Sequence, residues 1–440
     1  MSMLASSLAA GHQVSTVAVD HAAVAPLYVL AATAVLVFVA DLFVTRFRPL
    51  VLAGATAIGV ITAAVTALTV TGEGRRSSFC VPGGRLASGV SVGPDCSYVT
   101  GYASTALTVA TCAVAVVVLL LSIPLLADRN ETAGEYCFLL LCSVVGVVVL
   151  VGARDVLTLI VATEALTLPL YVLLALGRAR NGIVSATTFF TVSVVSTAIT
   201  LLGASLLYAQ LGVVHFHQLS VLLARDVADE PLLYVSMTLL LAGLLFKLAA
   251  VPFHGWAAGS YDAAPLPIVA YLSTISKLGG VAAVLLVALG VLGSQLPQLA
   301  VVLAVVAVAS MTLGNLAALA QLRLSRLIAW STIAQLGYVL APLGALVYAV
   351  SGSGAVNRGE VGELVAGSFG YLALYLLVTL GVLAVLTAVR LPHDDGGTLS
   401  RLEGLAYRRP WLCGALLFGL GGLAGLPPAF AGLFGKLAVL

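Results

Sequence analysis

Apolar runs of about 20 residues recur along this chain and limit its fold more than any other feature. Each run is long enough to cross roughly 30 Å of hydrocarbon as a helix. In lipid every backbone polar group needs an internal partner, so only helices and closed barrels span a membrane. The sequence shows no strand pattern, and its 440 residues are 61% hydrophobic and only 9% charged. We therefore expect an all-α polytopic membrane protein.

Twelve such runs are predicted to span the membrane. They lie approximately at 25–44, 50–71, 102–126, 135–152, 156–177, 185–210, 232–254, 265–293, 298–320, 326–349, 363–390 and 411–440. With the N-terminus outside, most loop arginines fall inside, as the positive-inside rule requires. Residues 1–24 lack the basic start of a cleavable signal peptide.

The lysines are distributed differently from the arginines. Lys247, Lys277 and Lys436 all lie within apolar runs, whereas the arginines lie in loops or at the ends of runs. A charge at the bilayer centre costs roughly 3 kcal/mol on insertion scales, so it needs a partner or a function. Lysine can release its proton when it is desolvated, and arginine effectively cannot. This distribution indicates proton handling.

Prolines lie close to two of these lysines. Pro252 follows Lys247 by five residues, and Pro427 and Pro428 precede Lys436. A proline inside a helix removes a backbone donor and interrupts the helix. Interrupted helices at membrane depth line polar cavities, and a pair of them in the two halves of a chain indicates an internal repeat.

Glu164 is the acid that lies well inside an apolar run, and it is the natural partner of Lys247. One interpretation is a static ion pair that holds two helices together. The other is a titrating pair on a path for protons. Buried ion pairs contribute little net stability, because desolvation offsets their attraction. The second interpretation is therefore favoured.

Several other polar residues are candidates for the same path. Hydroxyl groups at Ser273, Thr274 and Ser276 surround Lys277 and can hold water. His254 lies seven residues after Lys247, although a structural role after the Pro252 break is the alternative. Gln335 lies near the middle of its run, where polar packing between helices is the alternative.

The loop at 72–100 is polar, rich in glycine and predicted to lie outside. It contains Cys80 and Cys96, and an oxidising compartment permits a disulfide between them, although spacing alone does not show proximity. His215 and His217 are two residues apart and would lie on different helix faces, so no metal site is expected. The formal net charge of +2 gives no indication of nucleic-acid binding.

The sequence resembles a known family across residues 130–440. The matching motifs are FKLAAVPFHGWAAGSYDAAPLPIVAYLSTISKLGG, EALTLPLYVLLAL, LSRLIAWSTIAQLGYVLAPL and GLAGLPPAFAGLFGK. They resemble the antiporter-like subunits of respiratory complex I, and most of all the subunit N branch of bacterial NADH:quinone oxidoreductase. The resemblance implies fourteen helices with inverted repeats of helices 4–8 and 9–13, and broken helices 7 and 12. It divides the chain into N-terminal helices at 1–126, a first repeat at 127–293 and an incomplete second repeat at 294–440.

The resemblance also implies roles for individual residues. Glu164 and Lys247 match the family's ion pair, Lys277 matches its central lysine, and Lys436 matches the lysine near the exit. Gln335 occupies the position of a histidine in many members, and Thr188 occupies that of a lysine. The implied function is proton translocation across the bacterial cell membrane, driven by quinone reduction elsewhere in the complex. NADH, flavin, iron–sulfur clusters and quinone are expected in partner subunits, with no cofactor in this chain.

Two alternatives stay open beside this reading. The first is a subunit of a multisubunit cation/proton antiporter, and the second is a non-pumping membrane scaffold. The expected partners are other membrane subunits and the lipid bilayer, with no nucleic acid. Leu440 lies four residues after Lys436, inside an apolar run. The family continues further, so we expect a truncated piece or a short paralogue.

Overall fold

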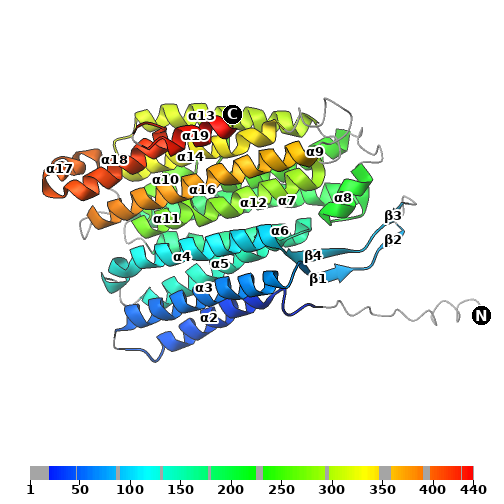
Figure 1. Cartoon of the computed structure of the whole chain (residues 1–440), viewed down its shortest axis with the longest axis horizontal. Coiled ribbons are helices and arrows are strands. Elements are labelled where there is room, and N and C mark those ends of the chain that lie inside the picture. The colour runs from blue at the N-terminus through cyan, green and yellow to red at the C-terminus, as the bar shows by residue number, and fades with distance from the viewer. Residues whose placement is uncertain are drawn as a thin grey trace, which may run out of the picture.

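In the computed structural model nearly every described segment is helical, and the helices run side by side along one axis (Figure 1). The structure describes residues 19–45, 47–85, 90–128, 132–176, 180–223, 231–292, 297–345, 358–389, 397–427 and 429–439. Pro428 and Leu440 therefore lie outside the described residues. Strands β1–β4 and helix α8 lie at one end of the bundle, called the hairpin end here, and α17 lies at the opposite end.

Ten spans among the described residues are long and apolar enough to cross a membrane. They are formed by α3 (Arg48–Gly72), α4 (Tyr102–Asp128), α5 (Ala133–Gly152), α6 (Val156–Ala175), α7 (Arg180–Leu211), α9 (Pro231–Leu248), the pair α11 (Leu266–Ser273) and α12 (Ile275–Leu292), α13 (Pro297–Leu319), α14 (Leu324–Gly344) and α16 (Arg358–Val389). Two shorter apolar helices, α2 (Ala25–Asp41) and α18 (Pro410–Ala424), occupy the two remaining predicted runs. The prediction of an all-α polytopic membrane protein is confirmed.

Two of these helices end at the interruptions that the prolines predict. Helix α9 stops at Leu248, and α10 (Ala257–Ala263) begins only after a series of turns. Helix α18 is followed by Gly425 and then by α19 (Ala431–Val439). Each helix ends at a left-handed residue, Ala249 with φ of 61° and Gly425 with φ of 82°. This conformation is a common way to end a helix, because it lets the next amides bond the last carbonyls.

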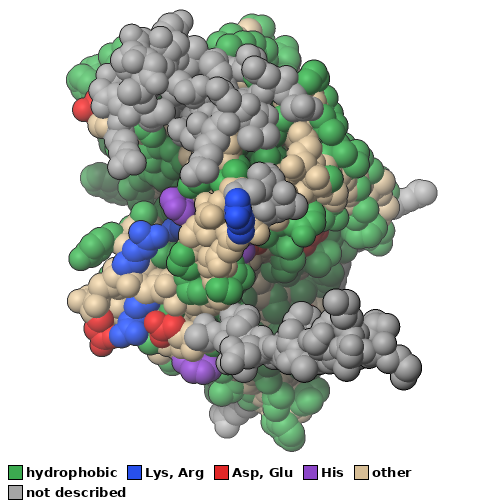
Figure 2. Space-filling model, turned by 90° about the vertical axis from the view of Figure 1, so that its right-hand side faces the viewer, with side chains coloured by type: hydrophobic (Ala, Val, Ile, Leu, Met, Phe, Trp, Pro, Cys, Tyr) green, Lys and Arg blue, Asp and Glu red, His purple; other side chains and the backbone are tan. Residues whose placement is uncertain are grey.

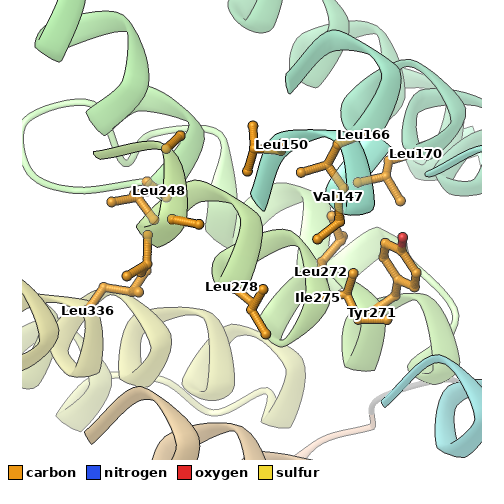
Figure 3. Packing of buried hydrophobic residues seen from close by; sticks show 14 of the residues in the cluster. Val147, Leu150, Leu166, Leu170, Leu248, Tyr271, Leu272, Ile275, Leu278 and Leu336 are labelled. Atoms are coloured by element: carbon orange, nitrogen blue, oxygen red, sulfur yellow. The ribbon is translucent and has the colours of Figure 1, made fainter. Parts of the chain in front are cut away.

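A third interruption separates α11 from α12 at Thr274, whose φ and ψ are −120° and −80°. Neither proline nor glycine occupies this position, so nothing in the sequence predicts the break. This interrupted helix is also the most enclosed of the ten described spans, since 89% of its apolar stretch is buried inside the bundle. Leucine and valine side chains from α5, α6, α9 and α14 pack around it (Figure 3).

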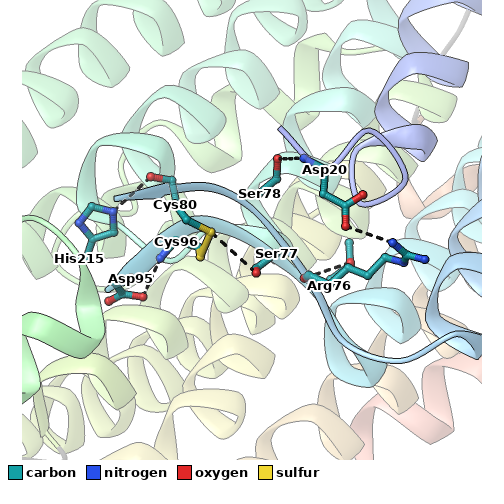
Figure 4. Close-up of a disulfide and its surroundings, with 10 residues drawn as sticks. Asp20, Arg76, Ser77, Ser78, Cys80, Asp95, Cys96 and His215 are labelled. Carbon is teal, nitrogen blue, oxygen red and sulfur yellow. Dashed lines mark hydrogen bonds and ion pairs between the residues drawn. A yellow bond between two sulfur atoms is a disulfide. The ribbon is translucent and has the colours of Figure 1, made fainter. Parts of the chain in front are cut away.

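The loop at 72–100 contains two short antiparallel strand pairs, which contradicts the expectation of no strands. Strand β1 (Arg76–Val81) pairs with β4 (Asp95–Thr100), and β2 (Gly84–Arg85) pairs with β3 (Ser91–Val92). These strands are short and polar, so they lack the apolar alternation by which a sequence signals a strand. Cys80 lies opposite Cys96 in the register, and the two form a disulfide (Figure 4). Charged and histidine side chains gather at this end, over otherwise hydrophobic flanks (Figure 2).

Backbone pairing recurs at opposite ends of the two halves. At the hairpin end, the loop between α5 and α6 pairs with the segment before α8 (Phe216–Leu223), where the Val156 amide donates to the Val214 carbonyl at 3.0 Å. At the other end, the loop between α13 and α14 pairs with the segment after α16, where the Leu324 amide donates to the Gly397 carbonyl at 3.2 Å. The same contact at opposite ends is the relation expected of inverted repeats.

Candidate functional site

An ion pair joins α6 to the last turn of α9. The Lys247 Nζ lies 2.7 Å from the Glu164 Oε1, as the sequence predicted. The ammonium also donates to the Ser193 Oγ at 2.5 Å and to the Thr167 Oγ1 at 3.3 Å. These three acceptors match the three donors of a lysine. The Thr197 hydroxyl donates to the same Glu164 oxygen, so the carboxylate is held from two sides.

Glycine allows the helices that carry this pair to approach closely. A Cβ atom at Gly243 of α9 would lie only 2.6 Å from the Ser196 carbonyl oxygen of α7. The Ser196 hydroxyl in turn donates to the Gly243 carbonyl at 2.7 Å. Small residues bring transmembrane helices into contact in this way. This contact places Ser193 of α7 within reach of Lys247.

Lys277 lies just beyond this pair and is fully enclosed, with 0% of its surface exposed. Its Nζ donates to the Leu248 carbonyl at 2.9 Å and lies 4.9 Å from the centre of the Trp256 ring. Leu248 is the residue after Lys247, so the end of α9 serves both lysines. No carboxylate of the described residues forms an ion pair with Lys277. A neutral carbonyl and an aromatic face hold this ammonium instead.

The interruption at Thr274 lies one turn before Lys277, and Tyr375 of α16 contacts it. The Tyr375 hydroxyl donates to the Ser273 carbonyl at 2.8 Å and lies 3.0 Å from the Thr332 Oγ1 of α14. The hydroxyls of Ser273 and Thr274 donate to the Ala270 carbonyl of their own helix. The sequence gives no sign of this role for Tyr375, because isolated tyrosines are ordinary packing residues in apolar helices.

Lys436 repeats the arrangement of Lys277 at the second proline break. Its Nζ donates to the Leu423 carbonyl at 2.9 Å and to the Ala424 carbonyl at 3.2 Å, both at the end of α18. It also lies 4.9 Å from the centre of the Tyr338 ring. Both lysines therefore combine carbonyls at the end of a broken helix with an aromatic face.

Gln335 contacts the same carbonyl as Lys436. The Gln335 Nε2 donates to the Leu423 carbonyl at 2.9 Å, and its Oε1 accepts a hydrogen bond from Tyr371. Tyr371 lies one turn from Tyr375 on α16. The amide of Gln335 thus connects α14, α16 and the end of α18. Of the residues predicted from sequence, the structure brings Gln335 and Lys436 together through one oxygen atom.

His254 lies apart from these contacts. Its ring packs against that of Trp330, with 5.2 Å between the ring centres. Among the described residues no hydrogen bond joins His254 to Lys247, since the turns at 249–256 break the helical register between them. A role for His254 on the path therefore stays a prediction.

The polar groups on α6, α9, α12, α16, α14 and α19 form two sets of contacts, which together we call the line. The first part is the Glu164–Lys247 pair with Lys277, which donates to the Leu248 carbonyl at the end of α9. In the second part Tyr375 bonds the Ser273 carbonyl one turn before Lys277, and Gln335 and Lys436 share the Leu423 carbonyl. Tyr375 and Gln335 contribute to the second part of the line. Lysine, carboxylate and hydroxyl groups exchange protons readily, so the chemistry that fits this line is proton transfer.

The fold and this line define a class of protein, namely a membrane-embedded, antiporter-like subunit with broken helices and buried lysines. Comparison with known proteins agrees. The family model for the transmembrane region of NADH:quinone oxidoreductase and Mrp antiporters matches residues 153–440. The chain belongs to this family, and within it to the subunit N branch of the bacterial NADH-quinone oxidoreductases.

Two relatives show the extent of the match. The chain is 48% identical to NADH-quinone oxidoreductase subunit N of Salinispora tropica, over 96% of this chain and 79% of the relative. It is 38% identical to subunit N 2 of Streptomyces griseus, over 96% of this chain and 76% of the relative. It is a multi-pass protein of the bacterial cell membrane.

Solved structures share the fold. A chain of respiratory complex I from Thermus thermophilus is 28% identical, with a TM-score of 0.72, over 94% of this chain and 81% of that one. A chain of the Mrp complex from Dietzia is 24% identical, with a TM-score of 0.74, over 96% and 74% of the two chains. The second match shows the fold alone.

Proposed function

We propose that this chain translocates protons as a membrane-arm subunit of NADH:quinone oxidoreductase, driven by quinone reduction in other subunits. The observation that carries the proposal is Lys277, which is fully enclosed and bonded to the Leu248 carbonyl rather than to a carboxylate. Ionisable side chains at membrane depth are costly and rare, and those that face the interior of a helix bundle mark ion pathways and proton relays. A lysine held by a neutral acceptor can release its proton without leaving an unpaired anion behind.

The ion pair supplies a control point for this transfer. When Glu164 moves away from Lys247, the proton affinity of the lysine changes, and the proton passes toward Lys277. Leu248 links the two lysines. It follows Lys247 in the chain, and its carbonyl accepts a hydrogen bond from the Lys277 ammonium. The hydroxyl and amide groups of α14 and α16 then lead to Lys436, which we assign to the exit.

The redox chemistry is assigned to partner subunits. Relatives with this fold are named as subunits of NADH-quinone oxidoreductase, and one solved relative is part of respiratory complex I. We infer that NADH, flavin, iron–sulfur clusters and quinone bind to those partners, and that this chain contributes no redox centre. We also propose the division of the chain into 1–126, 127–293 and 294–440, which the backbone pairings at opposite ends support.

The test is Lys277→Met in the intact complex, purified and reconstituted into proteoliposomes. Methionine fills similar space and cannot carry a proton. NADH-driven acidification of the vesicle lumen should fall sharply while the complex stays assembled. Acidification at the unmutated rate would contradict the assignment of Lys277.

A cation/proton antiporter subunit is the second candidate, because the family model and the Dietzia structure include Mrp proteins. The two candidates differ in their need for sodium. Proton translocation by the proposed complex should proceed in sodium-free buffer, whereas a strict sodium requirement would favour the antiporter. Normal pumping by variants of Lys247, Lys277 and Lys436 would favour the third candidate, a non-pumping membrane scaffold.

A further inference from the structure

A second charged cluster lies away from the line of lysines, at the end of the bundle opposite the hairpin. Asp262 near the C-terminus of α10 accepts hydrogen bonds from three donors at the start of α14. The donors are the Arg323 Nε at 2.5 Å, the Ser325 Oγ at 2.7 Å and the Arg326 Nε at 3.1 Å. We call these four residues the α10–α14 clasp. A carboxylate is also favoured there because the N-terminus of a helix carries partial positive charge.

The clasp joins the two halves of the chain. Helix α10 follows the break in α9, whereas α14 belongs to the second half. The loop before α14 also pairs with the segment after α16, where the Leu399 amide donates to the Leu322 carbonyl at 2.9 Å. Arg323 therefore connects α10 to a backbone pairing of the second half.

The other end of α10 contacts the lysine site. Trp256 immediately precedes α10 and donates from its Nε1 to the Phe246 carbonyl at 3.1 Å, one residue before Lys247. Its ring stacks on Phe189 at 4.3 Å and faces the ammonium of Lys277. A shift of this short helix would therefore move a group that touches Lys277.

Helix α14 links the clasp to the Lys436 site. Its N-terminal turn holds Ser325 and the two arginines, and its middle holds Gln335, which contacts the acceptor carbonyl of Lys436. An α-helix transmits displacement along its axis because its backbone bonds are internal. Asp262 is thus linked through α10 to Lys277 and through α14 to Lys436.

We propose that Asp262 is a positioning residue that couples the lysine site of the first half to that of the second. The inference rests on the proposed function, since it concerns the order in which the two sites load and release protons. Stability alone does not account for the clasp. The arginine side chains are 44% and 49% exposed, and exposed ion pairs contribute about 0–1 kcal/mol. Loss of the charge should therefore leave the subunit folded.

The test uses Asp262→Asn in the whole complex, reconstituted into proteoliposomes. Asparagine keeps the shape and removes the charge that the two arginines bind. We expect a slower rate of proton uptake, by about fivefold, the lower end of typical couplings between sites. Asp262→Glu, which retains the carboxylate, should recover most of the rate.

The matched control is Asp41→Asn. Asp41 forms an ion pair with Arg48 at 2.5 Å at the turn between α2 and α3, which lies at the same end of the bundle, and its carboxylate packs against Gly134 of α5. This variant should pump at the unmutated rate if it assembles. An equal loss in both variants would show that Asp262 has only a general structural role.

A double variant separates coupling from local damage. If the clasp acts through α14, Asp262→Asn combined with Gln335→Ala should lose less than the product of the two single effects. Multiplicative effects would overturn the inference. Failure of the proposed function has a different signature, because Glu164→Gln and Lys277→Met would then also pump normally. Normal pumping by Asp262→Asn alone, with both of those variants impaired, would reject the clasp and leave the function standing.

Discussion

Replacing Glu164 by glutamine is the sharpest test of the ion pair. The change keeps an oxygen near the Lys247 Nζ and removes the charge, so shape is preserved. Breaking a buried pair from one side costs about 3–5 kcal/mol. The Glu164 side chain is 22% exposed, and Ser193 and Thr167 remain as acceptors, so the lower value applies.

This free energy sets the expected size of the kinetic effect. If the pair must form in each cycle, a loss of about 3 kcal/mol slows the dependent step by roughly 100-fold. The assay is NADH-driven acidification in proteoliposomes, with quinone reduction recorded in the same sample. Native gel electrophoresis checks that the complex is assembled.

Lys247→Arg is the companion variant, because arginine keeps the cation and the ion pair but cannot release a proton. Both variants should pump slowly, although only Glu164→Gln leaves the lysine without its anion. Pumping by both variants at the unmutated rate would refute the reasoning and reduce the pair to a structural contact. Slow pumping by Glu164→Gln alone would show that the pair supplies charge but that Lys247 itself need not lose its proton.

Three further outcomes follow from the contacts. Tyr375→Phe leaves the Ser273 carbonyl without its hydrogen-bond donor, at a cost of about 1–3 kcal/mol, and should slow pumping about tenfold. Normal pumping by this variant would show that Tyr375 is not part of the line. Ala249→Val puts a β-branched residue at positive φ in an enclosed site and should destabilise the subunit by about 2 kcal/mol. Ala249→Gly should be tolerated, and thermal inactivation of the two variants measures the difference. Cys80→Ser should free one thiol at Cys96 for an impermeant maleimide, whereas the unmutated protein should label there only after reduction.

The sequence predicts the features of this fold that the membrane makes obligatory. Spans are visible because lipid demands long apolar helices, and the break after Lys247 is visible because Pro252 cannot continue a helix. The contact between Glu164 and Lys247 follows because a charge at that depth needs a partner. These constraints act on single residues, so a sequence displays them directly.

Other features depend on backbone geometry and leave no such mark. The interruption at Thr274 has neither proline nor glycine, and Tyr375 contacts it from a helix about 100 residues away. The acceptors of Lys277 and Lys436 are carbonyl groups, which every residue possesses. The hairpin strands β1 and β4 lack apolar alternation because they are only six residues long and bury few apolar side chains, among them Tyr98 and Val99. Only the folded chain shows which of these groups meet.

The carbonyl acceptors at Leu248 and Leu423 also determine what mutagenesis can detect. An alanine scan alters side chains and leaves the main chain in place. Replacing Leu248 or Leu423 by alanine would therefore keep the carbonyl that accepts from the lysine, and the scan would not detect this hydrogen bond. A comparison of sequences does not reveal these acceptors either, because any residue compatible with the turn supplies the same carbonyl oxygen. Only a change in the main chain itself would weaken this acceptor, such as an ester bond in place of the amide that follows Leu248. For two of the three lysines, Lys277 and Lys436, the acceptor is thus determined by the path of the backbone and not by the identity of a residue.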